Sequence, residues 1–375
     1  MSSDIALERL VQHDGIVHYP LGAGSYVFQS HFVDYMAKQS VKKSMRISIG
    51  AQPNSSPHFG TLVVFSLAFS LGYYLKQQGI DVEVFFEMVD TAPARKVVKG
   101  GIEYQVSLRE SGTAQQYLEE YTTLMNQLKN ISGVDYSYRG QQEFNGQEKI
   151  PSIVQTLIEQ KEKIGALLDP DNGLLCMRAA CPTCGLTDKE GIHNKFESSQ
   201  SGWGMESRCP DHGAFTIQIE TEASRLEYNT PLRNLIRALV YAEDTKDEHV
   251  PFEWLRVTGS DYAGYYQEQL LYKVASMVGY LAHELPPIIY APLITDWSGA
   301  KLSKSLYVKQ NAYQYMPQYL VNYQQFIQKF GEKGVEKLFN EVSGWVREPS
   351  KLFRSYSVYY FMDVFTNEFG NTHQS

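Results

Sequence analysis

The residues best suited to chemistry lie in two short motifs, PNSSPHFGT and KLSKS, which most of the chain separates. The first motif, residues 53–61, follows the hydrophobic run 46–49, which predicts a strand that ends in a turn. The apolar run 62–75 predicts a helix buried on most faces. His58 and Gly60 therefore lie at a helix start, where backbone N–H groups and the helix dipole can hold phosphate. The neighbouring positions predicted to contact the nucleotide are Pro53, Asn54 and Thr61.

The second motif, residues 301–305, follows the apolar run 288–294, which predicts a strand. Lys301 and Lys304 would lie on a loop, where two ammonium groups can follow the charge that builds on a pyrophosphate leaving group. Alone, this string is a common solvated loop, and a histidine near a helix start is equally weak. Both motifs together, each after a strand, predict an ATP site that also includes Ser303 and Ser305.

A third element, VTGSDYAGYYQEQ at residues 257–269, predicts a strand that ends at Gly259 and Asp261 before a helix. Ligands of a doubly wound sheet bind at the carboxyl ends of strands, so this turn should face the same crevice as His58. Gly259 would admit the adenosine, and Asp261 would accept a hydrogen bond from a ribose hydroxyl. The alternative is that Asp261 only caps the helix.

A substrate pocket is predicted where the end of one strand meets the start of this helix. Glu87 and Asp90 would pair with an amino group of the substrate, whether the α-amino group or one on the side chain. Tyr262 and Gln269 would line the other side of the pocket. Surface or capping roles for the two carboxylates are the alternative.

A cysteine constellation predicts a metal site, through CPTCG at residues 181–185 and CPDHG at residues 209–213. Three thiolates and one imidazole suit a closed, tetrahedral structural zinc, and the ligands would be Cys181, Cys184, Cys209 and His212. The alternative is four buried or incidental residues. Cys176 falls outside the pattern and is interpreted as a plain buried thiol.

Composition agrees with a globular enzyme. The 375 residues predict two or three compact units, and clustered cysteines favour a reducing compartment over a disulfide framework. No signal peptide opens the chain, and the longest apolar run falls short of the roughly 20 residues of a membrane span. A net charge of -8 argues against a strongly basic nucleic-acid surface. We therefore expect a cytoplasmic protein without membrane or DNA partners.

Strand and helix patterns alternate along the chain, which predicts an α/β fold with a doubly wound parallel sheet. Further helices are predicted at residues 30–40, 114–130, 152–168, 232–241 and 262–278, and further strands at 82–89 and 255–258. The predicted divisions are 1–168, the first half of the nucleotide-binding domain; 169–225, a zinc-binding insertion; 226–305, the second half; and 306–375, a short helical C-terminal region.

These motifs resemble the signatures of class I aminoacyl-tRNA synthetases, a His-x-Gly-His type motif and a Lys-Met-Ser-Lys-Ser motif. Thr61 stands where the family often has His or Asn. Within the class, AQPNSSPHFGT and FFEMVDTAPARKV look most like class I lysyl-tRNA synthetases, although Tyr262 stands where those enzymes commonly have His. The resemblance covers roughly residues 45–310 and implies a Rossmann-like, HUP-type catalytic domain.

The resemblance implies ATP-dependent activation of an amino acid to an aminoacyl adenylate, with Mg²⁺ accompanying the ATP and Zn²⁺ in the insertion. The short tail leaves no room for a large helical anticodon-binding domain, so we expect transfer of the acyl group to a small amine or a carrier. Charging of a tRNA by a compact synthetase, resembling a lysine–tRNA ligase, is the alternative. The other alternative is an inactive synthetase-like protein that binds an amino acid or RNA.

Overall fold

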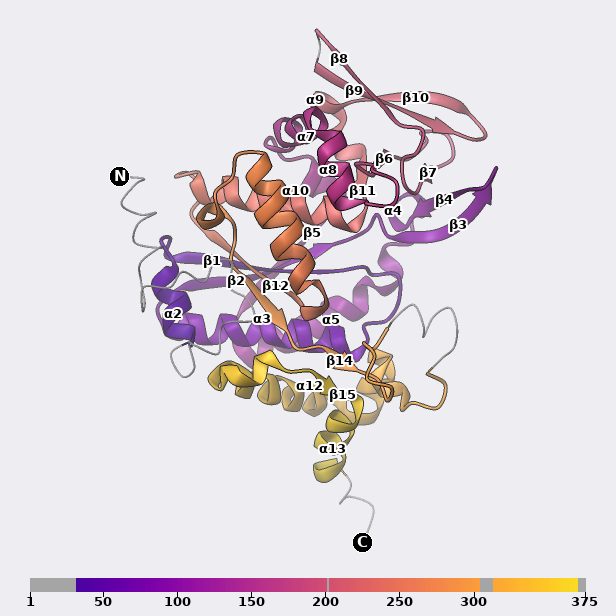
Figure 1. The fold of residues 1–375 in the computed structure, drawn as a ribbon. Coiled ribbons are helices and arrows are strands. Elements are labelled where there is room, and N and C mark those ends of the chain that lie inside the picture. The colour runs from indigo at the N-terminus through magenta and orange to yellow at the C-terminus, as the bar shows by residue number, and fades with distance from the viewer. Residues whose placement is uncertain (1–31, 201, 304–312, 370–375) are drawn as a thin grey trace.

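A five-stranded parallel sheet forms the centre of the molecule (Figure 1). The computed structural model describes residues 32–200, 202–303 and 313–369. The order in space is β13-β12-β1-β2-β5, so chain order reverses between β1 and β12, the switch point of a doubly wound sheet. The predicted α/β class with a mainly parallel sheet is confirmed. The strands are β1 (Ser44–Ala51), β2 (Asp81–Met88), β5 (Asp135–Gly140), β12 (Glu253–Gly259) and β13 (Ile288–Ala291).

Helix α3 (Phe59–Gln77) begins directly after the first motif and is apolar around almost its whole circumference. It packs on β1 and β2 with one side and on the C-terminal helix α12 (Tyr323–Arg347) with another, so most of its surface needs apolar side chains (Figure 1). Its length and composition would also allow it to cross a membrane, but 67% of its apolar window is buried inside the fold. A core helix has the same properties, so length and composition are weak evidence for a membrane span.

The remaining larger helices cover both faces of the sheet. Helix α5 (Gln115–Ser132) lies on the same side as α3, and α10 (Thr230–Lys246) lies on the opposite side (Figure 1). The Asn229 side chain caps α10 by accepting from the Leu232 amide at 3.0 Å. Residues 152–168, predicted as one helix, form two, because the backbone leaves helical geometry at Gln160. These are α7 (Ile150–Glu159) and α8 (Lys161–Leu168), and the short helices are α2 (Phe32–Gln39), α4 (Leu108–Ser111), α6 (Gln141–Asn145) and α9 (Ile219–Glu222).

Two further boundaries differ from the prediction. The run 288–294 is not one strand: β13 ends at Ala291, and β14 (Ile294–Thr295) follows after Pro292, which lacks the amide that a ladder needs. Residues 262–278 are not a plain α-helix, because a 3₁₀ turn (Ser260–Tyr262) leads into a π-helix (Tyr265–Ala275). Such wide turns occur often at functional sites.

The sequence patterns missed a hairpin of β3 (Pro93–Lys99) and β4 (Ile102–Ser107), whose Gly100 and Gly101 both adopt positive φ. Its polar, exposed outer strand carries little apolar alternation, although a Gly-Gly pair is a hairpin signal. Strand β7 (Leu186–Asp188) of the predicted insertion pairs with β4. The other strands of this segment are β6 (Met177–Ala179), β8 (Lys195–Ser199), β9 (Gly202–Cys209) and β10 (Gly213–Gln218), and β6 pairs with β11 (Leu226–Tyr228).

The described C-terminal region is helical and shares one apolar core with α3. Helix α12 turns sharply at Gly331, whose φ is 60°. Strand β15 (Tyr356–Ser357) pairs with β14, and α13 (Val358–Phe369) ends the described chain (Figure 1). Buried side chains from β1, α3, α5 and α12 form a single cluster. The C-terminal helices therefore belong structurally to the sheet domain.

Candidate active site

A cavity of about 290 Å³ opens at the carboxyl ends of β1 and β12, the switch point of the sheet. Gly50 and Ala51 from β1 and Thr258 and Gly259 from β12 line its floor. The volume is near the roughly 300 Å³ lower end of small-molecule pockets. The cavity is the place where a doubly wound sheet binds its ligand.

The start of α3 forms one wall, with His58, Gly60 and Thr61 lining the cavity. His58 is the N-cap residue, and its carbonyl accepts the first helical bonds from the amides of Thr61, at 2.8 Å, and Leu62, at 3.2 Å. The amides of Phe59 and Gly60 precede those bonds, so they lie at the positive end of the helix. A Cβ on Gly60 would lie 2.9 Å from Cε1 of His58, so this position needs glycine while the imidazole is so placed.

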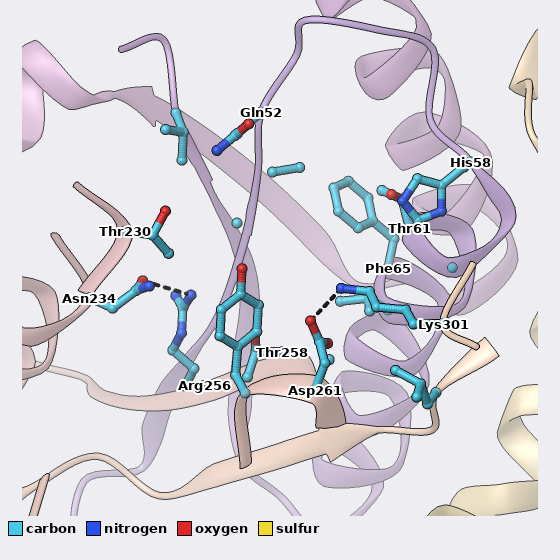
Figure 2. A pocket seen from close by; sticks show the side chains of 18 of the residues that line it. Gln52, His58, Thr61, Phe65, Thr230, Asn234, Arg256, Thr258, Asp261 and Lys301 are labelled. Carbon is cyan, nitrogen blue, oxygen red and sulfur yellow. Dashed lines mark hydrogen bonds and ion pairs between the residues drawn. The ribbon is translucent and has the colours of Figure 1, made fainter. Parts of the chain in front are cut away.

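Lys301 reaches the same cavity from the loop after β14, and its ammonium forms an ion pair with the Asp261 carboxylate (Figure 2). Its nitrogen lies 5.8 Å from the centre of the Tyr262 ring, which also lines the cavity. The structure thus brings together His58 and Lys301, which are far apart in sequence. The predicted residues Lys304 and Ser305 lie outside the described residues.

Three other residues predicted to contact ATP lie beside the cavity without lining it. Pro53 is buried in the turn before α3, and Asn54 follows it. The Ser303 amide donates to the Tyr313 hydroxyl at 3.0 Å. Ser303 does not line the main cavity, but it lines a small neighbouring pocket of about 10 Å³, which His58 also lines.

The predicted amino-acid ligands Glu87 and Asp90 lie elsewhere. Glu87 is buried, and Arg139 donates to its two carboxylate oxygens at 2.7 and 3.0 Å. Burial raises the pKa of Glu87, but the charges of Arg139 and Arg237 outweigh burial and hold that pKa below its usual value. Asp90 accepts from the Gln141 amide at 3.2 Å, and burial raises the pKa of its carboxyl. The remaining predicted ligand, Gln269, also lies outside the cavity lining.

Sequence reasoning missed three arginines that line the cavity: Arg233 and Arg237 from α10 and Arg256 from β12. Each is buried, with exposed fractions of 7%, 2% and 7%. Their signal was present in the sequence, because Arg233 and Arg237 interrupt the apolar face of one helix at an i, i+4 spacing. Arg256 likewise stands between the apolar residues Leu255 and Val257 in the middle of a buried strand. The same wall carries Thr230, Asn234 and Tyr266.

The predicted metal ligands Cys181, Cys184, Cys209 and His212 lie together, with all four donor atoms within 4.8 Å of one another. The sulfurs of Cys184 and Cys209 are 3.6 Å apart, and Nδ1 of His212 lies 3.5 Å from Cys209 and 3.8 Å from Cys181. Tetrahedral zinc with Zn–S bonds of about 2.3 Å separates two sulfurs by about 3.8 Å, so the donor set fits this ion. β9 and the turn before β7 supply the thiols.

No protein-family model matches the sequence, and no curated protein matches it. Among solved structures, a Campylobacter jejuni protein assigned as an arginyl-tRNA synthetase is 9% identical, with a TM-score of 0.39 over 80% of this chain and 62% of its own. Glutamate-tRNA synthetase from Elizabethkingia anophelis is 13% identical, with a TM-score of 0.34 over 71% and 54%. Tyrosyl-tRNA synthetase from Archaeoglobus fulgidus is 11% identical, with a TM-score of 0.37 over 93% and 99%. This chain therefore spans less than two thirds of the first two.

Proposed function

We propose that this protein is an ATP-dependent ligase that activates an amino acid as an aminoacyl adenylate. The observation that carries the proposal is the meeting of two distant motifs in one cavity. His58 and Gly60 at the start of α3 line the same space as Lys301 and Asp261, at the switch point of the sheet. A helix start, an ammonium group and a strand-end carboxylate suit the phosphates and the ribose of ATP.

The reaction begins when an oxygen of the amino-acid carboxylate attacks the α-phosphorus of ATP. The bond between that phosphorus and the bridging oxygen breaks, and pyrophosphate leaves with the electron pair. His58 and the amides of Phe59 and Gly60 steady the phosphates, and Lys301 neutralises the leaving group. From its place in the KLSKS motif, we expect Lys304 to share that role. Catalysis comes from positioning and electrostatics, without a covalent enzyme intermediate.

Two metal ions belong to the proposal. Magnesium would accompany the ATP and be held mainly by the phosphates of the substrate and by water. Zinc would be held by Cys181, Cys184, Cys209 and His212 as a closed structural site. Because free, clustered cysteines are typical of a reducing compartment, we also propose that the enzyme is cytoplasmic.

For the acceptor, we favour a small amine or a carrier over a tRNA. The net charge of -8 supports this choice, since strong tRNA binding needs a basic surface. A lysyl-type tRNA ligase is the alternative. Incubation with radiolabelled amino acid, ATP and total tRNA distinguishes them, because acid-precipitable label would contradict the small-acceptor proposal.

The first experiment is ATP–pyrophosphate exchange with each standard amino acid, with and without tRNA. Exchange with one amino acid supports the adenylating function. Failure with every amino acid, combined with ATP binding, would favour a binding protein instead.

Lys301→Ala should lower the exchange rate by roughly 100-fold or more, because removal of one preorganised charge costs catalysis about that much. Lys273→Ala serves as the control, since that lysine is exposed on the π-helix and pairs with Glu268. Equal loss in both variants, or an unchanged Lys301→Ala rate, would contradict the role given to Lys301.

A further inference from the structure

Two guanidinium groups meet next to Gly50 at one end of the cavity, and a third arginine lines the same cavity. A Cβ on Gly50 would lie 3.3 Å from Nη1 of Arg237 and 3.6 Å from Nη2 of Arg256. Arg233 lies one turn before Arg237 on α10 and lines the same wall. Figure 2 shows Arg256, Asn234 and Thr230 on one side of the cavity and His58, Thr61 and Lys301 on the other. The arginine wall is therefore separate from the groups assigned to ATP.

This wall carries more positive charge than the described residues balance, because Glu87, the carboxylate whose charge acts on Arg237, also pairs with Arg139. Arg233 donates to the Thr230 hydroxyl at 3.2 Å. Arg256 donates to the Ser48 hydroxyl at 3.1 Å and, at 3.5 Å, to Oδ1 of Asn234 and to the Tyr266 hydroxyl, so its partners are neutral. Glu87 is the buried carboxylate nearest in the network, but Arg139 already binds both of its oxygens. In the described chain, the Nε atoms of Arg233, Arg237 and Arg256 are buried and have no hydrogen-bond partner.

Buried arginines are almost always paired, because an unpaired buried charge costs several kcal/mol. Burial, with the nearby charge of Arg237, lowers the pKa of Arg233 to about 9. A wall of three buried guanidinium groups that share one carboxylate with Arg139, open to a cavity, fits an anionic ligand. The planar fork of a guanidinium binds a carboxylate through two parallel hydrogen bonds.

The reacting carboxylate of the substrate is a poor candidate for this wall. Guanidinium groups that hold its oxygens would stabilise the ground state and weaken the nucleophile. The proposed function assigns the ATP phosphates to His58, Gly60 and Lys301, which lie on the other side of the cavity. The anion that remains is a second acidic group on the amino acid itself.

We propose that Arg233, Arg237 and Arg256 bind the side-chain carboxylate of a dicarboxylic amino acid, which is the substrate class of this site. The inference rests on the proposed adenylating function and adds its specificity. It replaces the predicted pairing of Glu87 and Asp90 with a substrate amino group, since neither carboxylate lines the cavity.

The test measures binding before chemistry. Isothermal titration without ATP compares glutamate and aspartate with glutamine, asparagine and lysine. The better acid should bind at least about 100-fold more tightly than its own amide, because the amide leaves buried charges unpaired. Inorganic phosphate is titrated in parallel. Equal affinity for acid and amide, tighter binding of lysine, or phosphate binding as tight as the acid would overturn the proposal.

Substitutions test whether the arginine wall causes the tighter binding of the acid. Arg233→Met and Arg256→Met should each weaken binding of the acid by roughly 10- to 100-fold and leave weak amide binding unchanged. Arg233→Lys keeps the charge and should recover part of the affinity. Arg347→Met, which removes an exposed arginine on α12, is the control and should change nothing. Wild-type affinity in both arginine-wall variants would overturn the assignment.

Pyrophosphate exchange with the same amino acids separates this inference from the function on which it rests. Exchange driven by lysine or a neutral amino acid, and not by either acid, would keep the ligase and overturn the acidic subsite. Acid binding without any exchange would keep the subsite and overturn the ligase.

Discussion

At the scale of single residues, two glycines allow neighbouring side chains to fold back over the backbone. A Cβ on Gly60 would meet the His58 ring, and a Cβ on Gly259 would lie 2.5 Å from Oδ1 of Asp261. Asp261 in turn holds Lys301. The placement of both proposed ATP-binding side chains thus depends on the absence of a neighbouring Cβ.

Arg233 illustrates a conflict between stability and binding. Its folded pKa lies below the unfolded value, so the protonated form destabilises the fold at every pH below about 9 and less as pH rises through that value. We predict that Arg233→Met raises the unfolding free energy of the ligand-free protein by about 1 to 4 kcal/mol at pH 7. Thermal unfolding without amino acid measures this effect.

The matched control is Arg139→Met, which leaves the Glu87 carboxylate with fewer partners and should lower the melting temperature. A fall in melting temperature for Arg233→Met would show that this arginine has a structural partner.

At the scale of elements, the Glu87–Arg139 pair joins β2 to the edge strand β5. Because the folded pKa of Glu87 is lowered, its stabilising effect is fully present above pH of about 4.5 and is lost as pH falls through the folded pKa. We predict that Glu87→Gln lowers the unfolding free energy by about 3 to 5 kcal/mol at pH 7. Urea titrations from pH 7 downward should show the difference from wild type shrinking below pH of about 4.5.

Glu83→Gln on the same strand is the control. Its partner Arg46 lies at 2.9 Å, but both side chains are about one third exposed, so the change should cost less than about 1 kcal/mol. A loss for Glu87→Gln no larger than for Glu83→Gln would contradict the prediction.

The metal-binding segment is also an element-scale feature, since Cys181 and Cys209 pack with Tyr104, Val106 and Leu186 in a small cluster. We predict one zinc per chain by elemental analysis and its loss in Cys184→Ser, because the closed tetrahedron needs all four ligands. Cys176→Ala should retain this zinc, because Cys176 lies with Asp169 and Glu190 and not among the four ligands. Zinc retained by Cys184→Ser, or lost equally in both variants, would contradict the assignment.

At the scale of the whole molecule, two large apolar cores lie against the sheet. One unites α3, α5 and the C-terminal helices, and the other unites α10 with the segment that carries the cysteines. The cavity opens at the carboxyl ends of the two central strands β1 and β12. Its geometry therefore depends on the correct packing of both cores.

Trp345 on α12 tests this dependence. It is fully buried and stacks on Tyr356 at 4.4 Å. We predict that Trp345→Ala lowers the unfolding free energy by about 3 to 5 kcal/mol and weakens ATP binding together with stability. Denaturant unfolding followed by circular dichroism and by bound-nucleotide fluorescence measures both effects.

Trp297→Ala is the companion variant. Trp297 is 48% exposed, so its replacement should lower the unfolding free energy far less than Trp345→Ala does. Separate transitions for the two probes in Trp345→Ala would mean that the C-terminal helices unfold independently.

Some features could be predicted from local sequence, since their physical causes are local. The apolar run before Gly50 and the apolar run after Gly60 predicted β1 and α3, so His58 was correctly expected at a helix start. The Cys-x-x-Cys and Cys-x-x-His spacings likewise predicted a cluster, because short turns bring such side chains together. Strand β5 escaped prediction, because it is a polar edge strand without a clear apolar alternation.

Only the tertiary structure decided which charges neutralise one another. Glu87 looked available for a substrate, but β5 and α10 place Arg139 and Arg237 beside it. Arg233, Arg237 and Arg256 were not singled out from the sequence, and only folding brings them to one cavity wall, where Glu87 is shared between Arg139 and Arg237. Local patterns report backbone preference and burial over a few residues. Electrostatic pairing depends on side chains that are distant in sequence, so the character of the pocket emerged only from the fold.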